Sequence, residues 1–167
     1  MSKPTLKITQ DFTKEFNDII KGFKNDAVLV GIPETKTARK DESSAEIGNA
    51  AILAINEFGS PLNNIPPRPV MALGIRQAQE SISQEFKKAA VAALEKGLSA
   101  LAIYYERAGI IASNSVKKVI NSQEGFKGPS EATLISRKAA GFSGSKALIV
   151  TGQLRNSITY VVNKGGL

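Results

Sequence analysis

The chain has 167 residues, about the length of one domain, and it contains no Cys and no His. Disulfides, thiolate metal sites and mechanisms of the Ser-His-Asp or Cys-His type are therefore excluded. The net charge of +7 lies entirely in residues 107–167, which contain nine basic residues and only two acidic ones, Glu124 and Glu131. This asymmetry indicates an anionic partner, or an acidic neighbour in an assembly, for the last third of the chain.

The rest of the composition is that of a soluble domain. Apolar residues make up 42% of the chain, enough for a core, and no apolar run reaches the ~18 residues of a membrane span. Aromatic residues make up only 6% and Trp is absent, which is little for a protein that stacks single-stranded bases. Residues 1–10 lack the apolar centre of a secretion signal. We expect a soluble protein of the cytoplasm without a membrane partner.

The first elements are predicted to be a helix and a strand. Residues 11–24 carry apolar side chains at helical spacing, and either Thr9 or Asp11 is placed to cap this helix. Its apolar face consists of Phe12, Phe16, Ile19, Ile20 and Phe23. Residues 27–32 are apolar and partly β-branched up to Pro33, which predicts a buried strand.

A charged segment separates this strand from the next helix. Residues 34–42 have no apolar anchor and predict an exposed, mobile loop. Ser43 and Glu46 then match a capping box, so a helix should begin there and end at Gly59. The predicted apolar face of this helix consists of Ile47, Ala51, Ile55 and Phe58.

The segment 60–69 contains four prolines, which remove backbone donors and fix φ, so it is not regular secondary structure. It is predicted to be a rigid connector. The alternative is a loop of fixed shape that presents Asn63, Asn64 and Arg68 to a neighbouring molecule.

Two long helical patterns follow, over residues 70–96 and about 99–121, with Gly97 between them. The first has a stripe of Ile75, Ile82, Phe86, Ala90, Ala93 and Leu94, and the second a stripe of Leu101, Tyr105, Ala108, Ala112, Val116, Val119 and Ile120. Gly109 lies inside the second pattern and costs ~1 kcal/mol relative to Ala. If Gly97 is only a kink, the patterns form one helix of ~75 Å, a length typical of a ring or tube component.

The last part of the chain combines an insertion with a closing strand. Residues 123–147 are rich in Gly and Ser and predict a flexible arm around a short helix that starts at Ser130. Residues 153–158 predict a helical turn, and residues 159–162 a strand that pairs with the first one. The predicted fold is a single α+β domain over residues 1–167. It has a small antiparallel sheet packed by several helices, one of them long or kinked.

The sequence contains no well-supported catalytic or phosphate-binding motif. Ser143 to Lys146 match S-x-x-K, but the companion motifs of serine–lysine enzymes are absent. The glycines before Lys146 do not have the spacing of a phosphate-binding loop. Carboxylate pairs such as Glu80 and Glu85 lie on polar helix faces, whereas acid–base catalysis needs facing carboxylates in a cleft. We therefore predict no enzyme, and no catalytic, cofactor-binding or metal-binding residues.

The basic residues of the last third are candidates for binding phosphates, and the alternative is an ordinary solvated face. They are Arg107, Lys117, Lys118, Lys127, Arg137, Lys138, Lys146 and Arg155. Only Phe126 and Phe142 lie among the basic loop residues, which is weak support for base stacking. No signature of a sequence-specific nucleic-acid-binding protein is visible.

Three stretches make the sequence recognisable. They are NEFGS leading into IPPRP (Asn56 to Pro69), GPSEATL followed by RK (Gly128 to Lys138), and KALIVTGQLRNSI (Lys146 to Ile158). In this order they resemble the tail-completion and neck proteins of tailed bacteriophages, the group that includes minor tail protein Z-like and virion-morphogenesis proteins. Val70 and Val150 stand where that pattern has Phe and Asp. The second departure removes a charge that could have paired across the loop.

The resemblance implies a structural virion protein at the head–tail junction, assembled in the cytoplasm of a bacterial host. Such proteins form homo-oligomeric rings, commonly six-fold, that cap the tail end and dock it to the head connector. The implied partners are copies of this chain, head connector or adaptor proteins, tail tube or tail terminator proteins, and DNA that passes through the lumen. The alternative from the charge alone is a small basic nucleic-acid-binding protein that acts through residues 107–167.

Under this interpretation the Pro-rich connector and the arm are the candidate contact segments. The candidate assembly-interface residues are Phe58, Asn63, Asn64, Arg68, Phe126, Arg137, Lys138, Phe142 and Arg155. The candidate residues facing DNA or the lumen are Lys117, Lys118, Lys127 and Lys146.

Overall fold

The fold is α+β, as predicted, and mostly helical with one two-stranded antiparallel sheet. The computed structural model describes residues 11–38 and 47–165. The helices are α1 (Thr13–Asn25), α2 (Asn49–Phe58), α3 (Val70–Lys96), α4 (Leu101–Ser122), α5 (Glu131–Ala139) and α6 (Gln153–Ser157). The strands are β1 (Ala27–Gly31) and β2 (Thr159–Asn163), and short 3-10 helices lie at η1 (Glu34–Lys36), η3 (Pro61–Asn63) and η4 (Leu98–Ala100).

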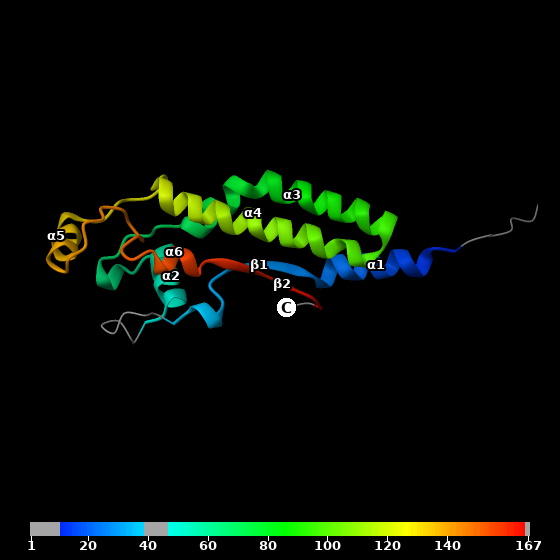
Figure 1. Cartoon of the computed structure of the whole chain (residues 1–167), viewed down its shortest axis with the longest axis horizontal. Coiled ribbons are helices and arrows are strands. Elements are labelled where there is room, and N and C mark those ends of the chain that lie inside the picture. Colours follow the sequence, from blue (N-terminus) through cyan, green and yellow to red (C-terminus); the bar gives the residue numbers. More distant parts are fainter. Residues whose placement is uncertain (1–10, 39–46, 166–167) are drawn as a thin grey trace, which may run out of the picture.

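The frame of the molecule is an antiparallel hairpin of the two long helices α3 and α4 (Figure 1). Gly97, with φ of 82°, and η4 reverse the chain between them. The break predicted at Gly97 is therefore a turn, and the single helix of ~75 Å does not form. The predicted stripe of α4 is confirmed, since all seven of its residues are buried.

The predicted face of α3 is only partly confirmed, since Ala93 is buried and Ile75 and Phe86 pack against the core. Leu94 belonged to the predicted stripe but is 60% exposed. The buried positions of α3 are mostly small: Val70, Gly74, Ala78, Glu85, Ala89, Ala92 and Ala93. A Cβ added at Gly74 would lie 2.6 Å from the Cα of Val116, so the two backbones are close there. Small side chains allow this approach of the two helices.

The sheet packs along α4 (Figure 1), and its register sets Ala27 opposite Asn163 and Gly31 opposite Thr159. Both predicted strands are thus confirmed, and they pair as expected. The first was predicted to be buried, which is wrong, since it is only partly buried and Leu29 is 42% exposed. Gly109 lies beneath the ring of Tyr160, where a Cβ would come 2.2 Å from a ring carbon. The glycine inside α4, which costs helix stability, makes room for the strand.

Two apolar clusters form the core along the hairpin. One joins α2, α3, α4 and α6 through Leu53, Val70, Val116, Val119, Ile120, Leu154 and Ile158. The other lies near the α3–α4 turn and includes Ala89, Ala93, Leu101 and Tyr105, with Ile19 and Phe23 of α1 packed against it. The rest of the predicted face of α1 stays outside, since Phe12 and Phe16 are exposed.

Helix α2 begins later than predicted, at Asn49 after Gly48. Ser43 and Glu46, the predicted capping box, lie outside the described residues. The predicted face is also wrong: Phe58 is exposed, whereas Asn49 and Leu53 are buried. Asn49 donates from Nδ2 to Ser157 Oγ at 3.0 Å, so its burial depends on a partner far along the chain.

The charged segment predicted over 34–42 is described only in part. Residues 34–36 form η1, and Thr37 accepts a backbone bond from Asn49 of α2. Residues 39–42 lie outside the described residues, so the predicted mobility stays a prediction.

Candidate functional site

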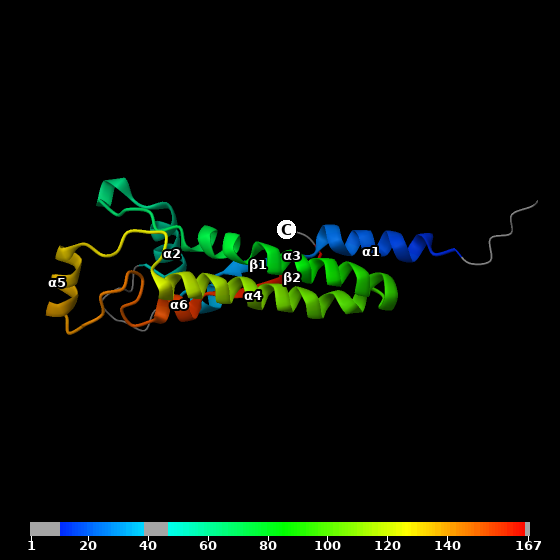
Figure 2. The ribbon, with the colours of Figure 1, turned by 90° about the horizontal axis from the view of Figure 1, so that it is seen from above.

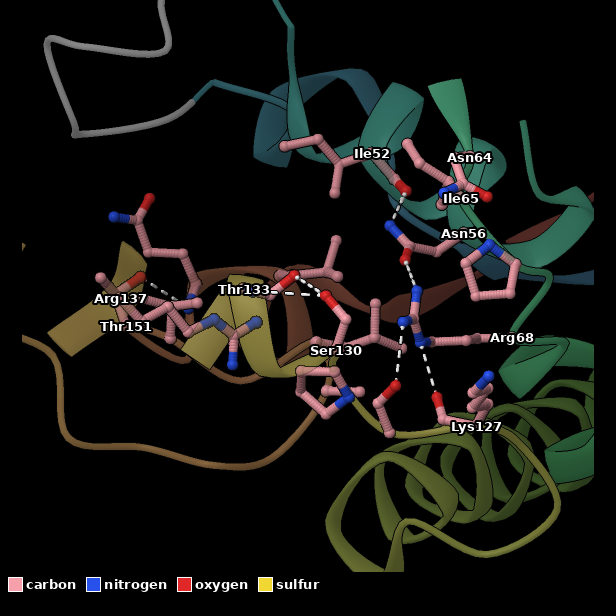
Figure 3. Close-up of a pocket in the computed structure, with 18 of the residues that line it drawn as sticks. Ile52, Asn56, Asn64, Ile65, Arg68, Lys127, Ser130, Thr133, Arg137 and Thr151 are labelled. Atoms are coloured by element: carbon pink, nitrogen blue, oxygen red, sulfur yellow. Dashed lines mark hydrogen bonds between the residues drawn. The ribbon is translucent and has the colours of Figure 1, made fainter. Parts of the chain in front are cut away.

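The three stretches that carry the resemblance meet around one groove of about 710 Å³ (Figure 3). One wall comes from α2 and the Pro-rich segment, a second from the arm and α5, and a third from residues 147–154. The groove lies at the end of the elongated molecule that carries α5, opposite the end that carries α1 (Figures 1 and 2).

The first stretch is a unit that joins α2 to α3. Arg68 Nη1 donates to Asn56 Oδ1 at 3.2 Å, and Asn56 Nδ2 donates to the carbonyl of Ile52 at 2.8 Å. The two carboxylate oxygens of Glu57 accept the backbone N–H groups of Met71 and Ala72, both at 2.9 Å. An anion at this position satisfies free amides and complements the positive end of the α3 dipole.

The Pro-rich segment is a tight turn. Ser60 and Ile65 form an isolated antiparallel bridge, with η3 between them, and Asn64 has a left-handed φ of 52°. Asn63 Nδ2 donates to Ser60 Oγ at 2.9 Å. Gly59, with φ of 76°, allows this turn to fold back, because a Cβ there would come 2.9 Å from the carbonyl oxygen of Ile65. The segment therefore has a defined shape, with Asn63 and Asn64 exposed.

Arg68 turns inward and holds the start of the arm (Figure 3). Its Nε donates to the carbonyl of Lys127 at 2.9 Å, and its Nη2 donates to the carbonyl of Gly128 at 3.3 Å. Burial, and then the positive charge of Arg137, lower the pKa of Arg68 from its usual value. All of these hydrogen bonds lie within the chain.

The arm, residues 123–147, is tied at both ends. The amide of Gln123 pairs with the backbone of Ala147, accepting its N–H at 2.6 Å and donating to its carbonyl at 3.0 Å. The short helix predicted to start at Ser130 is α5, and Ser130 Oγ caps it by accepting the N–H of Thr133 at 3.3 Å. Arg137 Nη1 donates to the carbonyl of Lys146 at 2.8 Å.

The third stretch closes against the end of α4. Arg155 Nη1 donates to Asn121 Oδ1 at 2.9 Å, and Lys146 Nζ donates to the carbonyl of Asn121 at 2.6 Å. Cations are favourable at the negative end of a helix dipole. The predicted turn over 153–158 is confirmed as α6, with Leu154 and Ile158 buried.

The predicted site residues fall into three places. Asn64, Arg68, Lys127 and Arg137 line the groove, while Lys146 and Arg155 lie at the end of α4. Phe126 packs against the first core cluster. The others lie outside these places: Phe58, Asn63, Lys117, Lys118, Lys138 and Phe142.

Sequence reasoning assigned no role to four residues that build the site: Asn56, Glu57, Asn121 and Gln123. Asn56 and Glu57 lie inside the NEFG motif, so the motif itself could have indicated that they have a role. Gln123 gave none, because its contact with Ala147 depends on a left-handed φ of 64° and on the path of the whole arm.

The groove has the chemistry of a binding site. Its cations are Arg68, Lys127 and Arg137, and among the described residues that line it none is acidic. Its apolar walls come from Ile52, Ile65, Pro66, Leu148, Val150 and Leu154. The hydroxyls of Ser130 and Thr133 bond to each other at 2.9 Å. Within residues 11–38 and 47–165, no group of three or more His, Cys, Asp or Glu residues could hold a metal ion.

The long helices of the part that the structure describes are not apolar enough to cross a membrane. The sequence matches no protein-family model and no curated protein, and the structure matches no solved structure.

Proposed function

We propose that the chain is a structural subunit of the head–tail junction of a tailed bacteriophage. It would form a homo-oligomeric ring that caps the tail end and docks it to the head connector. The observation that carries the proposal is that the three resembling stretches, separate in sequence, fold together around one groove. If the three stretches together build one binding surface, this explains physically why phage neck proteins carry them in the same order.

The exposed apolar residues support an assembly role. Phe12, directly before α1, and Phe16 on α1 are 61% and 52% exposed, and Phe58 and Leu62 are 81% and 100% exposed. The helices α1 and α2 lie toward opposite ends of the molecule (Figure 1). Large exposed apolar side chains in a soluble chain mark contact sites. Two different apolar surfaces at separate ends suit the head-to-tail contacts that close a ring.

The alternative of a nucleic-acid-binding protein has less support. Three of the cations that prompted it are used within the chain: Arg137 holds the arm, and Lys146 and Arg155 hold the end of α4. The groove has no aromatic residue among the described residues that line it, so it offers no stacking surface for bases.

Electron microscopy of particles assembled without this protein tests the proposal. We expect filled heads and finished tails that stay apart, and joining restored when the wild-type protein is added back. Heads and tails that join normally without it would overturn the proposal. DNA affinity that falls steeply with salt, together with normal joining, would favour the alternative instead.

A further inference from the structure

We propose that the groove binds a short extended peptide that carries a carboxylate beside aliphatic side chains, supplied by a neighbouring protein of the junction. The inference rests on the proposed function for the identity of that neighbour. The chemistry of the peptide follows from the groove itself.

The first argument is an uncompensated charge. Arg68 donates to the side-chain oxygen of Asn56 and to two backbone carbonyls, and Arg137 donates to the carbonyl of Lys146. In the part of the chain that the structure describes, neither guanidinium forms an ion pair with a carboxylate. Two fixed guanidiniums and Lys127 therefore line one groove without a counter-charge among its described lining residues.

The second argument is that Arg68 and Arg137 retain hydrogen-bond donors that no group of the chain uses in the described bonds. A guanidinium has five N–H groups in a planar fork. Arg137 uses one of its nitrogen atoms in the bond to Lys146, and Arg68 uses three nitrogen atoms in bonds with single acceptors. Both side chains are held in place by neutral partners, and each retains N–H groups that can bind a carboxylate. Bonds between such a fork and a carboxylate are among the stronger hydrogen bonds in proteins.

The third argument concerns the walls, which favour a peptide over nucleic acid. Pro66, Ile65 and Leu148 are examples of the proline and aliphatic residues that line the groove. Such walls suit Leu, Ile or Val side chains, whereas single-stranded nucleic acid needs aromatic platforms. The volume of about 710 Å³ accommodates a few side chains, and it falls within the ~300–1,000 Å³ of ordinary ligand sites.

The position of the groove agrees with a partner protein. It lies at the end of the molecule with α5, away from the hairpin turn and from α1 (Figure 1).

Selection from a library of random short peptides tests the inference on the purified full chain. We expect the enriched peptides to hold Asp or Glu next to Leu, Ile or Val. A fluorescently labelled copy of an enriched peptide should bind about tenfold more weakly to Arg137→Glu, because a charged hydrogen bond is replaced by repulsion. Lys127→Glu should weaken it as well. Circular dichroism establishes that each variant is folded.

Lys138→Glu is the matched control. It lies next to Arg137 on α5 and is exposed, but it does not line the groove. The inference would be overturned if Lys138→Glu weakened peptide binding as much as Arg137→Glu does, or if a single-stranded oligonucleotide competed equally well. It would also be overturned if the selection enriched neutral peptides or no peptide at all. Peptide binding is measured on the isolated chain and head–tail joining on particles, so either proposal can fail while the other stands.

Discussion

Gly74 sets how closely the two long helices approach each other. A Cβ at this position would lie 2.6 Å from the Cα and 2.8 Å from the backbone nitrogen of Val116. A backbone cannot move aside by changing a rotamer, so the hairpin itself would have to open. We expect Gly74→Ala to lower the free energy of unfolding by about 1–3 kcal/mol, even though alanine favours the helix by about 1 kcal/mol. Denaturant unfolding measures the loss.

Gly22→Ala is the control for this substitution. Gly22 also lies inside a helix, α1, but a Cβ there meets only the side-chain ends of Leu98 and Leu101. These side chains can adjust, so the variant should be as stable as the wild type or more stable. If both variants lost the same stability, the close backbone contact would not be the cause.

Tyr160 and Glu106 give the fold a dependence on alkaline pH. Tyr160 Oη donates to Glu106 Oε2 at 2.6 Å, and this bond is the main cause that raises the pKa of Tyr160 above its ordinary 10.0. Burial and the negative charge of Glu106 act in the same direction. Because the folded chain holds the phenol proton more tightly, the stabilisation is complete below the ordinary pKa. It is lost as the pH rises through the higher folded value.

The variant Tyr160→Phe should therefore be less stable than the wild type by about 1 kcal/mol or less at neutral pH, since the bond is partly exposed. The difference should shrink as the pH rises above about 10. Unfolding at neutral and alkaline pH in the wild type and the variant measures it. In a Glu106→Gln background the pH-dependent part should be much smaller, and a difference that stayed constant with pH would contradict the assignment.

Among the elements, α3 depends on a residue outside it. Glu57 accepts the backbone N–H groups of Met71 and Ala72, which belong to the first turn of α3. Glu57→Gln keeps one oxygen and removes the charge, so we expect a loss of about 1 kcal/mol in unfolding free energy. Thermal or denaturant unfolding checks this. Glu80→Gln, at an exposed position in the middle of α3, should change little, and an equal loss there would show that the helix end is not involved.

Elements whose apolar residues repeat regularly were predictable, as α4 and the strand pair show. The face of α3 was predicted only in part, because its contact with α4 uses Gly74 and alanines, which carry little hydrophobic signal. The start of α2 was also missed, since buried Asn49 is satisfied by Ser157, more than a hundred residues away in sequence. For the groove, the motifs located the walls, but neither the inward turn of Arg68 nor the pairing of Gln123 with Ala147 has a local pattern.

At the scale of the whole molecule, the basic excess of the last third has two uses. Lys146 and Arg155 lie at the carboxyl end of α4, and Arg137 holds the returning end of the arm. These cations stabilise the fold. Lys117 and Lys118 make no such contact among the interactions that the structure describes, so under the proposed function they are the residues that we expect to meet an acidic connector or DNA in the lumen. Only part of the basic excess in the last third can therefore serve to bind a partner.

The ring contact is predicted to join unlike ends of two subunits. One surface carries Phe58 and Leu62, and the other carries Phe12 and Phe16 at the start of α1. Under the proposed function the wild type forms rings, and we expect a Phe58→Asp, Leu62→Asp variant and a Phe12→Asp, Phe16→Asp variant each to be monomeric instead. Their stability should change little, because all four side chains are largely exposed.

A mixture of the two variants distinguishes a head-to-tail contact from a symmetric one. Each variant keeps one intact surface, and only one pairing of intact surfaces exists between them, so the mixture should form a one-to-one dimer and nothing larger. Native mass spectrometry of the separate and mixed proteins gives the masses directly. Ile103→Asp, on the exposed side of α4, is the control for adding a charge to an apolar surface and should still form rings. Dimers in either variant alone would indicate a symmetric contact, and rings in both would exclude these surfaces from the assembly.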